Sequence, residues 1–179
     1  MLRAGNVLRS FLLNSKGGER PARFSTKMAN AELLNRVREE VEELHRSFVS
    51  WFAGEGCSDD DDTFERMFTS RLPKDALYIF PGGTVSRFGD FFGTLRAAYG
   101  SSPAFRIAIR DVQIALREGN MVVTTYVEWQ KGSKNSTPAE NGRRTSVVME
   151  VCDDGIKWRH LHETWLPLEQ MAKGPFDEF

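Results

Sequence analysis

Apolar residues recur three and four positions apart in three segments of the chain, which is the spacing of one helix face. The first segment runs from Asn30, which can cap a helix, to about Ala53, where "GEG" can end it. The second follows the aspartates at 59–62 and stops before Pro73. The third lies within "SRFGDFFGTLRAAYG". We therefore predict three helices in the first 100 residues.

The four consecutive aspartates, Asp59–Asp62, could begin a calcium-binding loop or a helix. An EF-hand loop starting at Asp59 would require glycine at its sixth position and glutamate at its twelfth, where the chain has Phe64 and Ser70. Aspartate side chains also accept hydrogen bonds from the free amides of a helix N-terminus and favour its positive end. We therefore predict a helix start here and no bound metal.

After Ala104 the period of the pattern changes to two, which predicts strands. In "FRIAIRDVQIALR" the parity of the apolar positions slips near Asp111, as expected for a bulge in a long bent strand. "MVVTTYVEWQK", "GRRTSVVMEV" and "IKWRHLHETWL" follow, separated by turn signals or a polar loop. A short strand at residues 76–80 comes earlier. This order predicts an α+β domain, in which helices cover one face of an antiparallel sheet.

Composition is that of a globular protein, with 40% apolar and 27% charged residues. No run of 18 apolar residues occurs, so we predict no membrane span. Residues 29–179 carry 18 basic and 24 acidic groups, and this net charge of −6 argues against binding nucleic acid. Cys57 and Cys152 match no metal spacing and favour a reducing compartment. We expect no cofactor.

Residues 1–27 have the composition of an organelle transit peptide, because they are basic and contain a single acid, Glu19. "RPARFST" resembles a mitochondrial processing site, with cleavage after Phe24. We predict mitochondrial import, with plastid import and an untargeted cytoplasmic tail as alternatives. The chain then divides into this segment, a domain at 28–168 and a C-terminal tail at 169–179.

The order of elements resembles the nuclear-transport-factor-two-like fold and, within it, the SnoaL-like proteins. The resemblance covers about residues 30–167 and rests on four features: the first helix ending in "SFVSWFAGEG", "ALYIFPGG" with its Pro-Gly break, the helix closing on "LRAAYG", and a last strand of the form Trp-x-x-x-His. It implies a conical half-barrel, in which a curved antiparallel sheet wraps around three helices and leaves a pocket at its open end.

Members of this fold include binders, enzymes and assembly modules, so the resemblance leaves the function open. We favour a domain that binds a small apolar or aromatic molecule, because aromatic walls with a few polar groups are typical of such sites. The predicted pocket residues are Trp51, Tyr78, Phe92, Tyr126, Glu128, Arg144, His160 and His162.

An isomerase, dehydratase or cyclase is the first alternative. The steroid isomerases carry a base aspartate before the proline of the short strand, where this chain has Phe80. Relatives similar to scytalone dehydratase use histidines with tyrosines and an acid, which His160, His162, Tyr78 and Tyr126 could supply together with Glu128. The second alternative is a homo-oligomeric module similar to the association domain of calmodulin-dependent kinases.

Strand alternation decides how "WRHLHETWLP" is interpreted. It places His160 and His162 on one face, which we expect to be the concave face, and Glu163 on the other. Two histidines in this arrangement could bind a metal, but the sequence offers no assured third ligand, since the orientation of His45 on the first helix is undetermined. Pocket-lining histidines and histidines that hydrogen-bond across the sheet both remain possible.

Two further expectations follow from the same alternation. Arg143 and Arg144 face opposite ways, so one of them could reach an anion or carboxylate in the pocket. The outer face of the sheet would expose an apolar surface, which predicts a homodimer. Some of the following residues would form that surface: Val123, Val127, Trp129, Leu161 and Trp165.

Overall fold

A computed structural model describes residues 30–134 and 136–179, so the predicted transit peptide lies outside the described residues. The three predicted helices and the predicted strands are present, together with a short strand and a C-terminal helical turn that the pattern did not predict. In chain order the elements are α1 (Asn30–Ala53), α2 (Asp61–Phe64), its π-helical continuation η1 (Glu65–Thr69), β1 (Leu77–Ile79), β2 (Val85–Arg87), α3 (Phe88–Ala97), β3 (Arg106–Glu118), β4 (Met121–Lys131), β5 (Asn141–Cys152), β6 (Gly155–Trp165) and α4 (Leu168–Met171).

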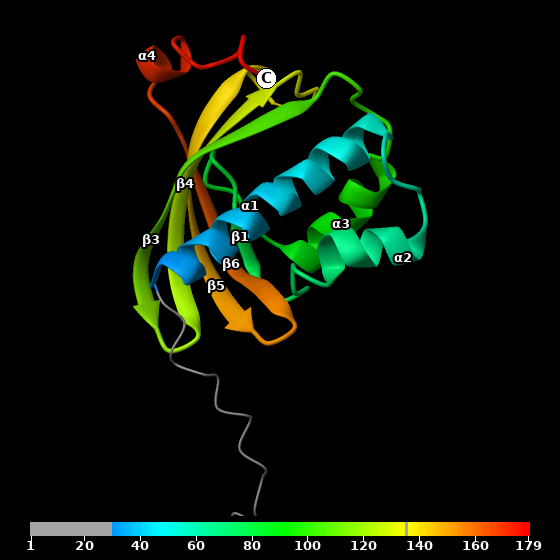
Figure 1. Cartoon of the computed structure of the whole chain (residues 1–179). Coiled ribbons are helices and arrows are strands. Elements are labelled where there is room, and N and C mark those ends of the chain that lie inside the picture. The colour runs from blue at the N-terminus through cyan, green and yellow to red at the C-terminus, as the bar shows by residue number, and fades with distance from the viewer. Residues whose placement is uncertain (1–29, 135) are drawn as a thin grey trace, which may run out of the picture.

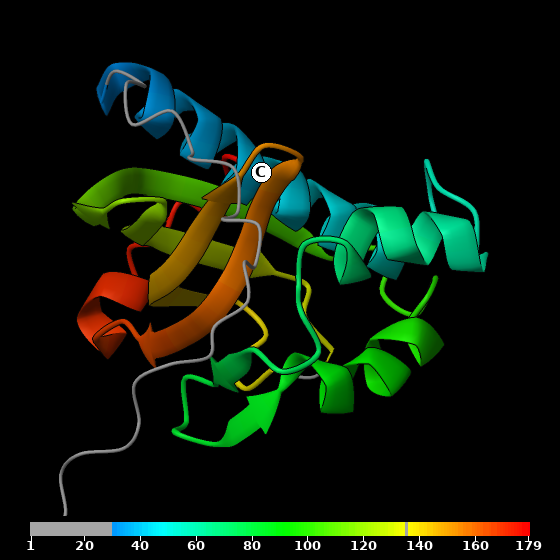
Figure 2. The ribbon, with the colours of Figure 1, turned by 90° about the horizontal axis from the view of Figure 1, so that it is seen from below.

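One curved sheet forms the frame of the domain, with the strand order β2-β1-β6-β5-β4-β3. The four long strands make an antiparallel meander, and β1 joins the edge of β6 in parallel. Figure 1 shows α1 lying across one face of the sheet, with α2 and α3 beside its C-terminal half. Seen from below in Figure 2, the sheet bends around the side that carries the helices. The predicted α+β class is confirmed.

The core lies between α1 and the concave face of the sheet. Leu33, Val37, Val41 and Leu44 are each at most 2% exposed, and their spacing puts them on one helix face. Burying a side chain of this size contributes roughly 1.5–3 kcal/mol, so this face holds α1 on the sheet. Among the described residues, no helix is long and apolar enough to cross a membrane.

The aspartate run begins a helix, as the sequence predicted. Asp60 is the N-cap of α2 and accepts a hydrogen bond of 2.7 Å from the backbone amide of Thr63. Hydrogen bonds from Ser58 and Thr63 hold the pKa of this carboxyl down to about 2.

Three register shifts interrupt the long strands, two between β3 and β4 and one between β5 and β6. Asp111 has a φ of 56°, and the pairing of β3 with β4 skips between Arg110 and Gln113, which confirms the predicted irregularity. The third shift is a bulge in β6, where Met149 pairs with Trp158 but Val148 pairs with His160. Arg159 is therefore an extra residue, and it reverses the facing of every side chain that follows it in the strand.

The C-terminal segment covers part of the outer face of the sheet. Val127, Leu166 and Met171 form a small buried cluster, and Trp129 packs against it. The ring of Phe176 meets Trp129 edge-on with 5.6 Å between the centroids. Of the residues expected on an exposed outer face, Val127 and Trp129 therefore lie largely beneath this segment.

Candidate functional site

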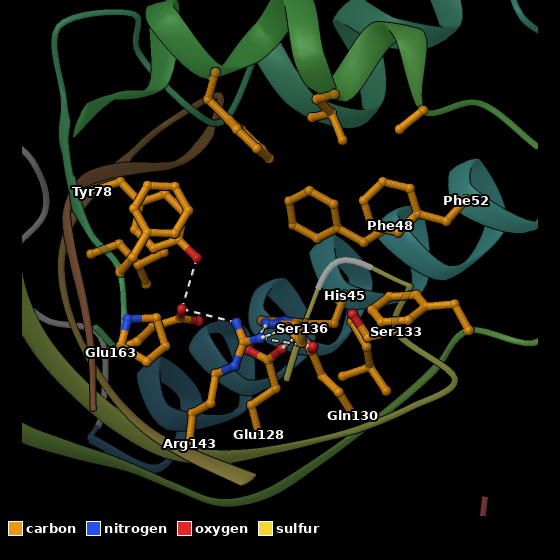
Figure 3. Close-up of a pocket in the computed structure, with 18 of the residues that line it drawn as sticks. His45, Phe48, Phe52, Tyr78, Glu128, Gln130, Ser133, Ser136, Arg143 and Glu163 are labelled. Carbon is orange, nitrogen blue, oxygen red and sulfur yellow. Dashed lines mark hydrogen bonds and ion pairs between the residues drawn. The ribbon is translucent and has the colours of Figure 1, made fainter. Parts of the chain in front are cut away.

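A cavity of about 560 Å³ opens between the concave face of the sheet, the C-terminal half of α1, and α3 (Figure 3). Its walls differ in chemistry. One side is mostly aromatic and apolar, and its main residues are Phe48, Phe52, Phe80, Phe88, Phe91, Leu95, Phe105, Ile107 and Leu161. The other side includes six hydrogen-bonding side chains, which we call the polar cluster: His45, Tyr78, Glu128, Gln130, Arg143 and Glu163.

Arg143, on β5, is the centre of the polar cluster. Its guanidinium donates one hydrogen bond of 3.0 Å to Glu163 Oε2 and another of 2.8 Å to Gln130 Oε1. It also donates to Asn141 Oδ1 at 3.2 Å and to Ser136 Oγ at 3.2 Å. Because most of its N–H groups already have acceptors within the protein, Arg143 orders the cluster rather than offering a free cation to a ligand.

His45 and Glu128 form the end of the cluster nearest α1. His45 Nδ1 lies 2.6 Å from the carbonyl oxygen of Val41, which can only accept, so Nδ1 donates. His45 Nε2 then faces Glu128 Oε2 at 3.1 Å, and this contact requires one shared proton. The other oxygen of Glu128 accepts from Gln130 Nε2 at 2.6 Å. Both oxygens of Glu128 are therefore committed to the protein.

The charge states of this pair follow from its geometry. Burial disfavours the carboxylate of Glu128, but the charge and hydrogen bond of His45, aided by Arg143, hold its pKa down to about 2. Burial likewise disfavours the His45 cation, yet the charge of Glu128 and the hydrogen bonds raise the pKa of His45 above its ordinary value. Both shifts favour the imidazolium–carboxylate form of this pair.

Glu163, on β6, is bound differently. Its Oε2 accepts from the hydroxyl of Tyr78 at 2.7 Å as well as from Arg143. Burial and the nearby negative charge of Glu128 raise the pKa of Glu163 to about 7, against the lowering effect of Arg143. This carboxyl is 3% exposed, so it is a fully buried group that changes its charge near neutral pH.

Tyr78, Tyr126 and Glu128 line the cavity, where the sequence placed them. Tyr126 is 1% exposed, and its hydroxyl lies 3.5 Å from His45 Nε2. That Tyr78, Tyr126 and Glu128 contact a ligand stays a prediction. Burial is the main cause that raises the pKa of both tyrosines well above the ordinary value, so they are neutral hydrogen-bonding groups at physiological pH.

The prediction that His160 and His162 face the concave side is wrong. The bulge at Arg159 turns both side chains to the outer face, where His162 is exposed. Leu161 and Glu163 point inward instead and line the cavity. Strict alternation was the right rule for each half of β6, but it fails across the extra residue.

Three other predicted pocket residues lie elsewhere. Arg144 is exposed, and Arg143 takes the inward position, in phase with the buried Val147 and Met149. Trp51 is 0% exposed and lies in the core behind the cavity, where its Nε1 donates to the carbonyl of Leu95 at 2.8 Å.

Phe92 also faces away from the cavity, because α3 turns it toward α2. Its ring meets Phe64 edge-on, with 6.0 Å between the centroids. The preceding residue, Phe91, lines the cavity in its place.

Four members of the polar cluster were not among the pocket residues predicted from the sequence: His45, Gln130, Glu163 and Arg143, the last of which was the alternative to Arg144. A signal for two of them was present. The apolar positions of β6 change parity between Trp158 and Leu161, just as those of β3 do near Asp111, and this change indicates a bulge. The run of alternate apolar residues from Val147 to Val151, extended backwards, puts Arg143 inside. For His45 and Gln130 we find no comparable signal.

Comparison with solved structures identifies the fold. A nuclear-transport-factor-two-like (NTF2-like) protein of unknown function from Pseudomonas aeruginosa matches with a TM-score of 0.64 and 24% identity, over 74% of this chain and 99% of that one. An NTF2-like protein from Cytophaga hutchinsonii matches with a TM-score of 0.54 and 16% identity, over 78% of this chain and 100% of that one. A proposed dehydratase of the NTF2-like family from Streptomyces avermitilis matches with a TM-score of 0.57 and 14% identity, over 78% and 99%.

These matches show that the chain has the NTF2-like fold, as the resemblance implied. No protein-family model and no curated protein sequence matches the chain. At these identities the likeness concerns the fold alone, and the site must be interpreted from its own residues.

Proposed function

We propose that this protein binds a small, uncharged and largely apolar molecule in the cavity, with a polar group of the ligand directed at the polar cluster. The observation that carries the proposal is a cavity of about 560 Å³ whose aromatic wall faces a buried set of hydrogen-bonding side chains. Sites for small organic molecules typically have this volume and this combination of a mostly apolar lining with a few placed polar groups.

The charges of the cluster favour an uncharged ligand. The His45–Glu128 ion pair is neutral as a unit, and Arg143 balances Glu163 when that carboxyl is ionised. A charged ligand would bring an unbalanced charge into a buried site, which is costly without a partner. A hydroxyl or carbonyl group needs only a hydrogen bond.

A fluorescent uncharged arene, aminoanthracene, tests the binding directly, because its emission rises when it leaves water for an apolar site. We expect saturable binding to the wild type and a large loss of affinity in Thr94→Trp. Thr94 is exposed at the rim and lines the cavity, so the indole would fill the opening without disturbing the core. Ala97→Trp is the matched control, since Ala97 is exposed on the same helix and does not line the cavity. Equal binding by both variants would refute the proposal.

An enzyme of the isomerase or dehydratase kind is the second candidate, and one observation favours it. A carboxyl group with a pKa of about 7 lines the cavity, and a group that titrates near the working pH is suited to proton transfer. The proposed dehydratase from Streptomyces avermitilis shares the fold. If the protein converts a bound molecule to product, and a change of Glu163 abolishes this conversion, the protein is an enzyme and not simply a binder.

A further inference from the structure

Glu163 differs from the other acidic group of the cavity in how its two oxygens are used. Tyr78 and Arg143 both donate to Oε2, from 2.7 and 3.0 Å. Among residues 30–134 and 136–179, no group donates to Oε1. The carboxyl is therefore held from one side while its second oxygen remains available toward the cavity that Glu163 lines.

We propose that Glu163 is the catalytic base of this cavity, and that it accepts a proton from a bound uncharged molecule through its free Oε1. This inference rests on the proposed binding function. Tyr78 and Arg143 act as positioning residues, because they fix the carboxyl without occupying the reacting oxygen. Phe80, which stands where the resemblance to steroid isomerases places a base, has no proton-accepting group.

Glu128 is not an equivalent candidate, although it lines the same cavity. Its Oε1 is bound by Gln130 and its Oε2 by His45, so it has no oxygen free of a protein partner. Its low pKa, about 2, also makes it a weak base. The geometry thus separates two buried carboxyls into one fixed ion-pair partner and one free acceptor.

The charged and titratable groups around Glu163 determine the pH range in which its carboxyl can act as a base. Arg143 from β5 and Tyr78 from β1 contact it, and Glu128 from β4 and His45 from α1 influence it through space. At a pH of about 7 half of the Glu163 carboxyl is in its base form, and this fraction rises as the pH rises further. The rate of proton abstraction is expected to rise with this fraction and to level off once the carboxyl is fully ionised.

Nitrobenzisoxazole, a small uncharged arene, reads out this step alone. A carboxylate removes its ring C–H proton, the electron pair of that bond forms a C≡N triple bond, and the N–O bond breaks to leave a coloured cyanonitrophenolate. The products are the protonated carboxyl and this anion, so atoms and charge balance without a co-reactant. The carboxyl then returns its proton to solvent.

We expect Glu163→Gln to lower kcat/KM for this probe by about 100-fold or more, the usual contribution of a general base. Glutamine can keep an oxygen toward Tyr78 and Arg143, so aminoanthracene binding should persist and report an intact cavity. His162→Gln is the matched control, because His162 is one residue away and exposed on the opposite face. It should leave the rate unchanged.

Tyr78→Phe tests the positioning role. The Tyr78 hydrogen bond lowers the pKa of Glu163, so its removal should move the inflection of the rate profile to higher pH. A purely structural role would not shift the inflection.

The outcomes are distinct. A Glu163→Gln protein that binds aminoanthracene and turns over the probe at the wild-type rate overturns the catalytic proposal and leaves the binding proposal standing. A wild type that binds aminoanthracene but turns over the probe no faster than Glu163→Gln also overturns the catalytic proposal. A wild type that binds neither compound overturns the binding proposal itself.

Discussion

Glu163→Gln should remove a pH dependence from the stability of the folded protein. In the folded state the pKa of Glu163 is about 7, against an ordinary value of 4.5. The folded protein therefore retains a proton that the unfolded chain has released. The stabilisation is complete below a pH of about 4.5 and is lost as the pH rises through about 7. The raised pKa arises mainly from burial of the carboxyl and from the neighbouring Glu128.

The magnitude follows from the size of this shift. At about 1.4 kcal/mol per pKa unit, the contribution of Glu163 to the free energy of unfolding changes by roughly 3 kcal/mol across the window. For a domain of this length that corresponds to a change of roughly 6–12 °C in Tm. Glutamine cannot ionise, so the variant should lack this component and be relatively more stable than the wild type at a pH of about 8.

Denaturant unfolding followed by tryptophan fluorescence measures the effect, at a series of pH values from about 4 to about 8 without ligand. The quantity of interest is the difference in unfolding free energy between wild type and Glu163→Gln, because the shared contributions of His45 and Glu128 largely cancel in it. A difference that does not vary with pH would refute the reasoning. So would a wild type that gains stability relative to the variant as the pH rises, since Arg143 would then dominate and keep the carboxyl ionised.

Three further predictions concern packing, assembly and targeting. Gly142→Ala should destabilise the protein by about 1–3 kcal/mol in the same unfolding assay, because an added Cβ would lie 2.6 Å from the ring of Trp129. Gly93→Ala should instead stabilise the protein by roughly 0.5–1 kcal/mol, because Gly93 lies within helix α3 and an added Cβ would meet no atom within 4 Å. Equal effects would contradict this packing. The predicted homodimer would use the apolar residues Leu116, Val123 and Val148, which pair across three neighbouring strands on the outer face of the sheet. Sedimentation should show a dimer, and a charged residue in place of Val148 should dissociate it. A monomeric wild type would reject the prediction. A fluorescent tag at the C-terminus should report import into mitochondria that deletion of residues 1–27 abolishes, and an evenly cytosolic signal would contradict the predicted address.

The local pattern of the sequence determined the elements of this fold. Helix α1 follows from its apolar spacing, the start of α2 from its capping aspartates, and the bend of β3 from the parity slip at Asp111. These features depend on residues close together in the chain, whose spacing and hydrogen-bonding groups can be interpreted directly. The pairing of β1 with the far strand β6 depends on residues about 80 positions apart, and no local pattern specifies it.

The composition of the cavity was decided by tertiary structure. One extra residue, Arg159, reverses the facing of the rest of β6, and thereby exchanges two histidines for Leu161 and Glu163 at the cavity. His45 joins the polar cluster only because α1 crosses the sheet with the helical turn that carries His45 lying over Glu128. A strand pattern reports which side chains share a face until its register shifts, whereas the contacts between faces depend on how helices and strands pack together.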